Sequence, residues 1–299
     1  MNLSSDQWRG HLSMLLFSAL VAGSFSLGHI VANEISPAAL NAMRFVLAGV
    51  IMGLFALASP GGLKRAHFQA PWRYLVLGAL FALYFVLMFE GLKTAKPVSA
   101  TAVFTLMPMM AAGFGWLLLG QVTTRRMAIA LTIAAIGALW VIFRGDISKI
   151  SSLDVGRGEV IYFIGCISHA IYTPMVRKLN RGESPVIFSF GTLVAGSVVL
   201  LIFGGRDLLT TDWAQVPGIV WMTLAYLVVF STATSFVLLQ YATLRLPSAK
   251  VMAYSYLTPS WVILLEAAIG NGLPGPMVML GVAATIVALY LLLKDEAGG

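Results

Sequence analysis

Long apolar segments, each about 20 residues, recur along the whole sequence and are separated by short polar stretches. A helix of that length matches the hydrocarbon thickness of a bilayer. Residues that break helices, such as Pro60, Pro71 and Pro217, fall at the edges of these segments. The pattern predicts an all-α integral membrane protein with ten spans, at residues 11–30, 37–57, 72–92, 98–119, 126–143, 159–177, 185–204, 216–238, 248–270 and 274–293.

The ninth predicted span contains two residues that a simple membrane anchor does not need, Pro259 at its middle and Glu266 beyond it. The fourth span has the same plan, since the Leu-Met-Pro sequence ending at Pro108 matches the Leu-Thr-Pro sequence ending at Pro259. Ser-Pro pairs at Pro37 and Pro185 are separated by nearly the same interval, about half the chain. The sequence therefore predicts two repeats.

We assign the first five-helix repeat to residues 10–148 and the second to residues 156–294. Because five is an odd number, the second repeat must enter the membrane upside down relative to the first. This is the inverted-repeat topology of many transporters, in which the substrate site lies near the membrane midplane between the halves.

Composition supports a membrane protein, with 59% hydrophobic residues, 10% charged residues and a mean hydropathy of +0.89. The net charge of +7 comes from cations scattered between spans, which does not indicate nucleic-acid binding. More of these cations fall in the loops on the side of the termini, so the positive-inside rule predicts that both termini are cytoplasmic. The single cysteine, Cys166, excludes an internal disulfide.

Both repeats are expected to place a bent helix at bilayer depth. Proline has no amide hydrogen, so Pro108 and Pro259 leave the carbonyls of Phe104 and Ser255 without their helical partners. Such a carbonyl is expected to face protein, water or substrate rather than lipid. The alternative is that the prolines only bend the helices to fit their neighbours.

Three motifs resemble EamA-type transporters of the drug/metabolite transporter superfamily. Residues 35–48 are similar to the second-helix signature of that family. Residues 22–25, Ala-Gly-Ser-Phe, lie where the family often has Trp-Gly-Ser-Asn-Phe, and residues 168–172, Ser-His-Ala-Ile-Tyr, resemble its sixth-helix Ser-Trp-Ala-Xaa-Tyr. Within the superfamily the chain is most similar to aromatic amino-acid exporters of the YddG type. The resemblance implies a multi-pass protein of a bacterial inner membrane.

The chain departs from the family pattern near the expected cavity, which leaves its substrate open. Gln121 and Asn271 stand where the family often has glutamate after the fourth and ninth helices. Ala22, His29 and His169 replace a tryptophan, a lysine and a tryptophan.

Candidate substrate contacts are hydroxyl, aromatic and proline positions within the spans, because Tyr combines an apolar ring with a polar tip. They are Ser24, Tyr84, Thr101, Thr105, Pro108, His169, Tyr172, Ser255, Tyr256 and Pro259. Glu266, the acid well inside a span, is a candidate for proton coupling. Alternatively it is a carboxylate near the outer end that reaches the interface or pairs with lysine. Arg44 is expected to bind carbonyls of a loop or a helix end.

Enzyme motifs are missing from the sequence, and no third ligand accompanies His29 and His169 to suggest a metal, so neither enzyme activity nor a cofactor is expected. The leading hypothesis is an exporter of aromatic or neutral amino acids, or related small metabolites, that works by alternating access through a central cavity. The alternatives are a transporter of drugs or phosphorylated metabolites with the same fold, and a membrane sensor or scaffold that transports nothing. The sequence does not identify the substrate, the coupling ion, the direction of transport or the oligomeric state.

Overall fold

The computed structural model describes residues 5–59, 62–143, 145–146 and 155–294, and most of them are helical. The helices are α1 (Ser5–Val31), α2 (Pro37–Ala58), η1 (Arg65–Phe68), α3 (Trp72–Leu92), α4 (Pro97–Phe104), α5 (Met107–Leu119), α6 (Arg125–Ile142), α8 (Arg157–Leu179), α9 (Pro185–Thr210), α10 (Gly218–Val228), η2 (Val229–Thr234), α11 (Ser235–Thr243), α12 (Ser248–Ala253), η3 (Tyr254–Leu257), α13 (Thr258–Ala268) and α14 (Pro276–Lys294). Their order matches the ten predicted spans.

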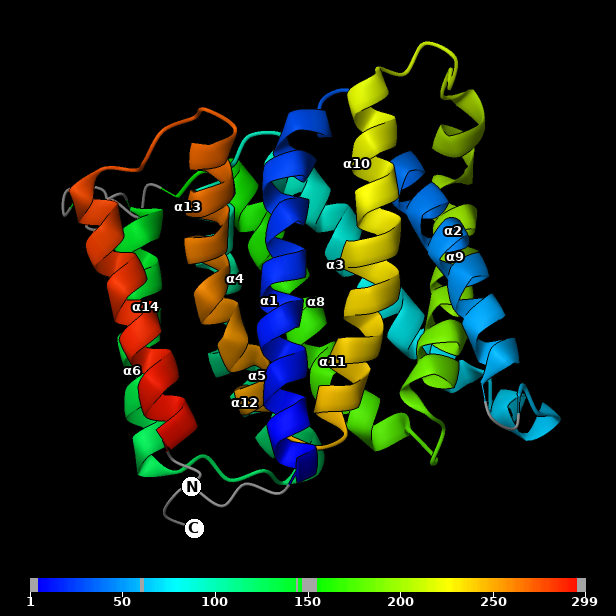
Figure 1. Cartoon of the computed structure of the whole chain (residues 1–299), viewed down its shortest axis with the longest axis horizontal. Coiled ribbons are helices and arrows are strands. Elements are labelled where there is room, and N and C mark those ends of the chain that lie inside the picture. Colours follow the sequence, from blue (N-terminus) through cyan, green and yellow to red (C-terminus); the bar gives the residue numbers. More distant parts are fainter. Residues whose placement is uncertain (1–4, 60–61, 144, 147–154, 295–299) are drawn as a thin grey trace.

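Nine helical stretches among the described residues are long and apolar enough to cross a membrane. The remaining predicted span, the ninth, is formed by α12, η3 and α13; it has the expected length but is interrupted. The helices run side by side, and α1 begins at the same end of the bundle at which α14 ends (Figure 1). This arrangement confirms an all-helical membrane protein.

Helix ends follow local rules. Proline occupies the first turn of α2, α4 and α9, where its missing amide hydrogen has no helical partner to lose. Gly120 ends α5 in the left-handed conformation at φ 65°, which a glycine adopts without steric cost.

The fourth and ninth spans, which contain Pro108 and Pro259, are interrupted at equivalent places, whereas α8 continues through its internal Pro174. Pro108 and Pro259 each lie in the first turn of a new helix, α5 and α13. The fourth span breaks after Phe104, and the ninth passes through the 3₁₀ segment η3. The predicted interruptions are therefore present in both halves.

The eighth span contains a feature that the sequence did not predict. Between α10 and α11 the backbone forms the π-helical segment η2, Val229–Thr234, whereas the third span is a single α-helix, α3. π-Helical turns are rare and occur frequently at functional sites. The third and eighth spans hold the same place in the two halves but differ in backbone geometry.

Close helix packing depends on small residues at several crossings. A Cβ atom on Gly78 of α3 would lie 2.4 Å from the backbone nitrogen of Gly196 on α9. A Cβ atom on Gly158 of α8 would lie 2.3 Å from the carbonyl oxygen of Gly91 on α3. Glycine at these positions lets the helix backbones approach closely, as small residues do in membrane proteins. The central helices are consequently held tightly around α3.

Candidate functional site

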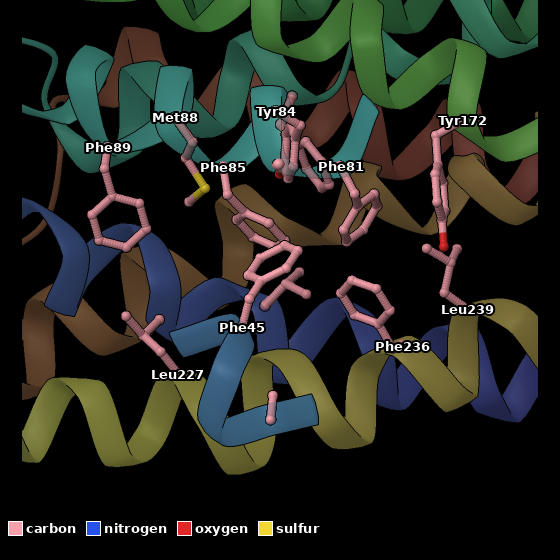
Figure 2. Packing of buried hydrophobic residues seen from close by; sticks show 14 of the residues in the cluster. Phe45, Phe81, Tyr84, Phe85, Met88, Phe89, Tyr172, Leu227, Phe236 and Leu239 are labelled. Atoms are coloured by element: carbon pink, nitrogen blue, oxygen red, sulfur yellow. The ribbon is translucent and has the colours of Figure 1, made fainter. Parts of the chain in front are cut away.

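An aromatic cluster fills the middle of the bundle and joins helices from both halves. Figure 2 shows Phe81 and Phe85 of α3 pointing toward Phe45 of α2 and Phe236 of α11. The ring of Phe81 lies 4.2 Å from the ring of Tyr172 and 4.3 Å from that of Phe236, measured between centroids. Contacts at these distances form a continuous apolar wall.

A small void lies against this wall, with a volume of about 10 Å³. It is lined by residues of α1, α3, α8, η2 and α11, and therefore by both halves of the chain. A space of this size holds about one water molecule. The centre of the protein is consequently closed.

Polar groups border the void on two sides. The hydroxyls of Ser24 on α1 and Ser231 on η2 share a hydrogen bond. His169 of α8 is 1% exposed, and neither of its ring nitrogens has a hydrogen-bond partner. Buried polar groups are nearly always paired, so an unpaired imidazole beside a void indicates a place for water or a ligand.

Arg44 lies next to this void and reaches from α2 into the π-helical segment. Its Nε donates to the Thr232 hydroxyl, and one Nη donates to the Ser231 carbonyl oxygen at 2.9 Å and to the Ser231 hydroxyl at 3.3 Å. The guanidinium carbon stacks 3.8 Å from the centroid of the Phe85 ring. The other Nη has no partner, and the whole side chain is buried. Arg44 thus binds a carbonyl, as expected, but the carbonyl belongs to the interior of another span.

Four of the predicted site residues meet at the centre. Ser24, Tyr84 and His169 line the void directly. Tyr172 lies beside them, with its ring centroid 5.8 Å from that of His169, and its hydroxyl accepts a hydrogen bond from Gln240.

The predicted residues of the fourth span lie outside the lining of the void. Thr101 and Thr105 are buried, but their hydroxyls donate to carbonyls of their own helix, those of Val98 and Ala102. Pro108 is buried in the first turn of α5. The span approaches the centre mainly through Phe104, whose ring lies 6.2 Å from that of His169.

The predicted residues of the ninth span also lie away from the void. Tyr256 packs in a second apolar cluster with α6 and α14, and its carbonyl accepts a hydrogen bond from Thr285. Ser255 is buried without a partner for its hydroxyl, and Pro259 is buried at the start of α13. The structure therefore does not bring these three residues together with Ser24 and His169.

Glu266 lines a larger hollow, of about 460 Å³, where α1 and α13 end and α4 and α14 begin. Its Oε2 accepts a hydrogen bond from Asn271 at 2.8 Å, and Lys96 lines the same hollow. Glu266 is only partly buried and lies near the end of its helix. A further hollow of about 200 Å³ opens at the opposite end of the bundle, beside Gln121 and Lys250.

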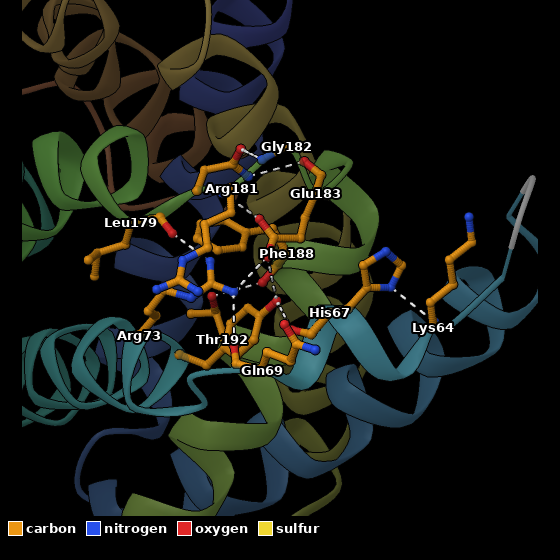
Figure 3. Close-up of polar contacts among 12 residues, drawn as sticks. Lys64, His67, Gln69, Arg73, Leu179, Arg181, Gly182, Glu183, Phe188 and Thr192 are labelled. Carbon is orange, nitrogen blue, oxygen red and sulfur yellow. Dashed lines mark hydrogen bonds and ion pairs between the residues drawn. The ribbon is translucent and has the colours of Figure 1, made fainter.

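A second buried arginine lies far from the void, at the start of α3. Arg73 donates to Glu183 Oε1 at 2.7 Å and to the Leu179 carbonyl at 2.6 Å (Figure 3). The backbone amide of Arg181 donates to the other carboxylate oxygen of Glu183 at 2.6 Å. Burial alone would raise the pKa of Glu183, but the hydrogen bonds from Arg73 and Arg181 outweigh it and lower that pKa.

Sequence reasoning did not find several residues around the void. Phe81, Phe85 and Ser231 line it but belong to otherwise ordinary apolar spans. Arg44 had a usable signal, because a cation within a span is costly unless it has a specific partner or function. In the part of the chain that the structure describes, no three His, Cys, Asp or Glu side chains lie close enough to hold a metal ion.

The bundle, its proline-interrupted crossings and the polar groups around a closed central void define a multi-pass helical membrane protein of the kind that moves small solutes. A sequence model of the EamA-like transporter family matches twice, over residues 8–143 and 156–294. The chain belongs to this family of transporters.

Two similar proteins are also named as transporters. A Bacillus subtilis protein named Uncharacterized transporter YyaM is 26% identical over 87% of this chain and 86% of its own length. A protein of Archaeoglobus fulgidus named Uncharacterized transporter is 24% identical over 94% of this chain and 96% of its own length. A solved crystal structure superposes with a TM-score of 0.70 at 20% identity and covers 99% of both chains. That likeness confirms the fold.

Proposed function

We propose that the protein exports aromatic or neutral amino acids, or closely related small metabolites, across a bacterial inner membrane by alternating access. The observation that carries this proposal is the central void, which the first half lines mainly with aromatic rings and the second half with polar groups, among them the unpaired imidazole of His169. Aromatic rings suit an apolar side chain, and the polar groups suit the charged ends of an amino acid.

We also propose that residues 10–148 and 156–294 act as two inverted repeats. The family match occurs once in each half. Each half also has one interrupted span in which a proline lies in the first turn of the helix that follows the interruption. Helix contacts support the same symmetry, because α2 packs on α9, α6 on α14 and α5 on α12. Each pair joins equivalent spans of the two halves.

Hollows at both ends of the bundle, with a closed centre between them, support alternating access. A void that holds one water cannot hold an amino acid, so transport requires α1, α3, α8 and the eighth span to separate. We infer that the closed structure corresponds to a state through which the transporter passes between inward-open and outward-open forms.

The test is counterflow in proteoliposomes loaded with a panel of neutral and aromatic amino acids, drugs and phosphorylated metabolites. We expect exchange of one or more amino acids and a strong loss of exchange in His169→Leu. Gly113→Ala provides the control, because a Cβ atom there meets nothing within 4 Å beyond its chain neighbours and the backbone of its own helix. Exchange of drugs or sugar phosphates alone would replace the proposed substrate class, and exchange of nothing by folded protein would favour a sensor or scaffold.

Proton coupling through Glu266 is a separate part of the proposal. Its carboxylate lines the larger hollow and has one oxygen without a partner, so it is placed to take up a proton from the aqueous side. Transport driven by an imposed pH gradient should be lost in Glu266→Gln. A variant that keeps the full pH dependence would rule Glu266 out.

A further inference from the structure

We propose that Arg44 is the binding site for a carboxylate of the transported molecule, which makes the substrate a carboxylic acid or an amino acid rather than an amine or a neutral solute. This inference rests on the proposed function, since it assumes that a solute occupies the central cavity. It assigns a substrate-binding role to a residue that the sequence indicated to be structural.

The first argument is charge. Arg44 is completely buried within a membrane-spanning helix, and all its hydrogen-bond partners are neutral: the Thr232 hydroxyl and the carbonyl and hydroxyl of Ser231. Among the described residues no carboxylate pairs with it. A buried charge without a counterion is costly, so intramembrane cations generally face a partner or a functional cavity. The missing partner here is an anion.

The second argument is geometry. A guanidinium presents five N–H donors in one plane, which fit the two oxygens of a carboxylate. The Phe85 ring covers one face of this plane, with its centroid 3.8 Å from the guanidinium carbon. Acceptors on η2 take hydrogen bonds from Nε and from one Nη. The other Nη is buried and unpaired. The group therefore retains donor capacity after its protein contacts are made.

The third argument is location. Two residues that contact Arg44, Phe85 and Ser231, also line the void. The unpaired imidazole of His169 lines the same void from α8. A neutral imidazole nitrogen can accept a hydrogen bond from an ammonium group, so the two sites together suit the two charges of a zwitterion. The aromatic wall between them receives the side chain.

A purely structural role for Arg44 is the competing explanation. In that case the guanidinium serves only to hold α2 against η2, through the Thr232 hydroxyl and the Ser231 carbonyl, which also accepts from the Ser235 hydroxyl. The two roles differ in one measurable respect, because only the binding role makes the protein distinguish a carboxylate from its amide.

Counterflow competition measures this distinction directly. For each amino acid that wild-type protein exchanges, the competitors are the same amino acid, its amide and its deaminated acid. We expect replacement of the carboxylate by an amide to weaken competition about tenfold or more, as for the loss of a charged hydrogen-bonded pair. In Arg44→Lys the preference should shrink, because lysine keeps the charge without the planar donors. In Arg44→Met it should disappear, whereas Arg181→Gln, which removes an exposed cation, should leave it unchanged.

A second measurement separates this inference from the proposed function. The thermal stability of purified protein is recorded with 3-phenylpropionate and with 3-phenylpropionamide, since a ligand of the folded state raises Tm. Protection by the acid alone, lost in Arg44→Met and retained in Arg181→Gln, supports the carboxylate site even if no amino acid is exchanged. Equal protection by acid and amide, or no protection by either, overturns it. Acid-selective protection that survives in both Arg44 variants overturns it as well.

Discussion

Among the residues that the structure describes, two arginines are almost completely buried, but they differ in what surrounds them. Arg73, at the start of α3, pairs with Glu183 in a network that also satisfies the ends of neighbouring helices. Arg44, two turns into α2, has only neutral partners. Each guanidinium leaves one buried nitrogen without a partner, so the difference between them is the carboxylate, which Arg73 has and Arg44 lacks. A paired charge near the end of a helix is part of the scaffold, whereas an unpaired charge at the centre indicates a site that awaits a ligand.

The largest effect is expected from removing the paired arginine. Arg73→Met leaves the Glu183 carboxylate buried without its partner and should lower the free energy of unfolding by about 3 kcal/mol. Thermal unfolding of the detergent-solubilised protein measures the change. The double variant Arg73→Met, Glu183→Leu should recover part of the loss, because two apolar side chains leave no charge unpaired. An unchanged Tm in the single variant would show that the pair contributes nothing.

A smaller loss in the free energy of unfolding, of about 2 kcal/mol, is expected from Glu183→Gln. Glutamine keeps the shape of the side chain but weakens the hydrogen bonds that Arg73 and Arg181 donate to the carboxylate. It should also change the pH dependence of stability. The pKa of Glu183 is lowered from its ordinary value of 4.5, so its stabilising contribution is complete above that value and is lost as pH falls through the lowered pKa. Wild-type Tm should therefore fall more steeply below about pH 4.5 than that of Glu183→Gln. Parallel curves would contradict this assignment.

Arg44→Met should change stability less than Arg73→Met, by about 1 kcal/mol or less in either direction. The variant removes a charge that no carboxylate compensates, so folding loses little while ligand binding is lost. Tm and counterflow measured on the same preparation test this contrast with Arg73→Met. A loss of stability as large as that of Arg73→Met would mean that both arginines belong to the scaffold.

The smallest effect is expected from Glu266→Gln, which should change stability by about 0.5 kcal/mol or less. The residue is only partly buried, and the hydrogen-bond partner of its carboxylate is the neutral amide of Asn271. Thermal unfolding checks this value. A large loss of stability would show that Glu266, like Glu183, stabilises the fold, and would argue against a role in proton coupling.

The sequence predicts most of the fold because span length and proline position are local properties. The ten crossings and the breaks before Pro108 and Pro259 follow from apolar runs and from the missing proline amide. The segment η2 does not follow from its own residues alone, because its Ser231 carbonyl accepts from the nearby Ser235 hydroxyl and also from Arg44, which lies in a span far away in sequence. No local pattern signals such a partner.

The candidate site was predicted only in part, for a physical reason that concerns helix rotation. Ser24, Tyr84 and His169 lie on continuous α-helical stretches, where the side chains that face the centre follow regular spacing. Tyr256 lies in the 3₁₀ segment η3, whose tighter winding changes the direction of the side chains that follow. Its ring consequently faces α6 and α14 rather than the void.

The π-helical segment gives the eighth span a way to rotate about its axis. A π turn accommodates one residue more than an α turn, and each residue of an α-helix advances about 100° around the axis. If Val229–Thr234 adopted α geometry, α11 would turn by about that angle relative to α10 without unwinding. Ser235, which lines the void, and Phe236 in the wall beside it would then swing away from the centre. A shift in hydrogen-bond register at the Ser231 carbonyl, which accepts from the Arg44 guanidinium and the Ser235 hydroxyl, would thus widen the passage.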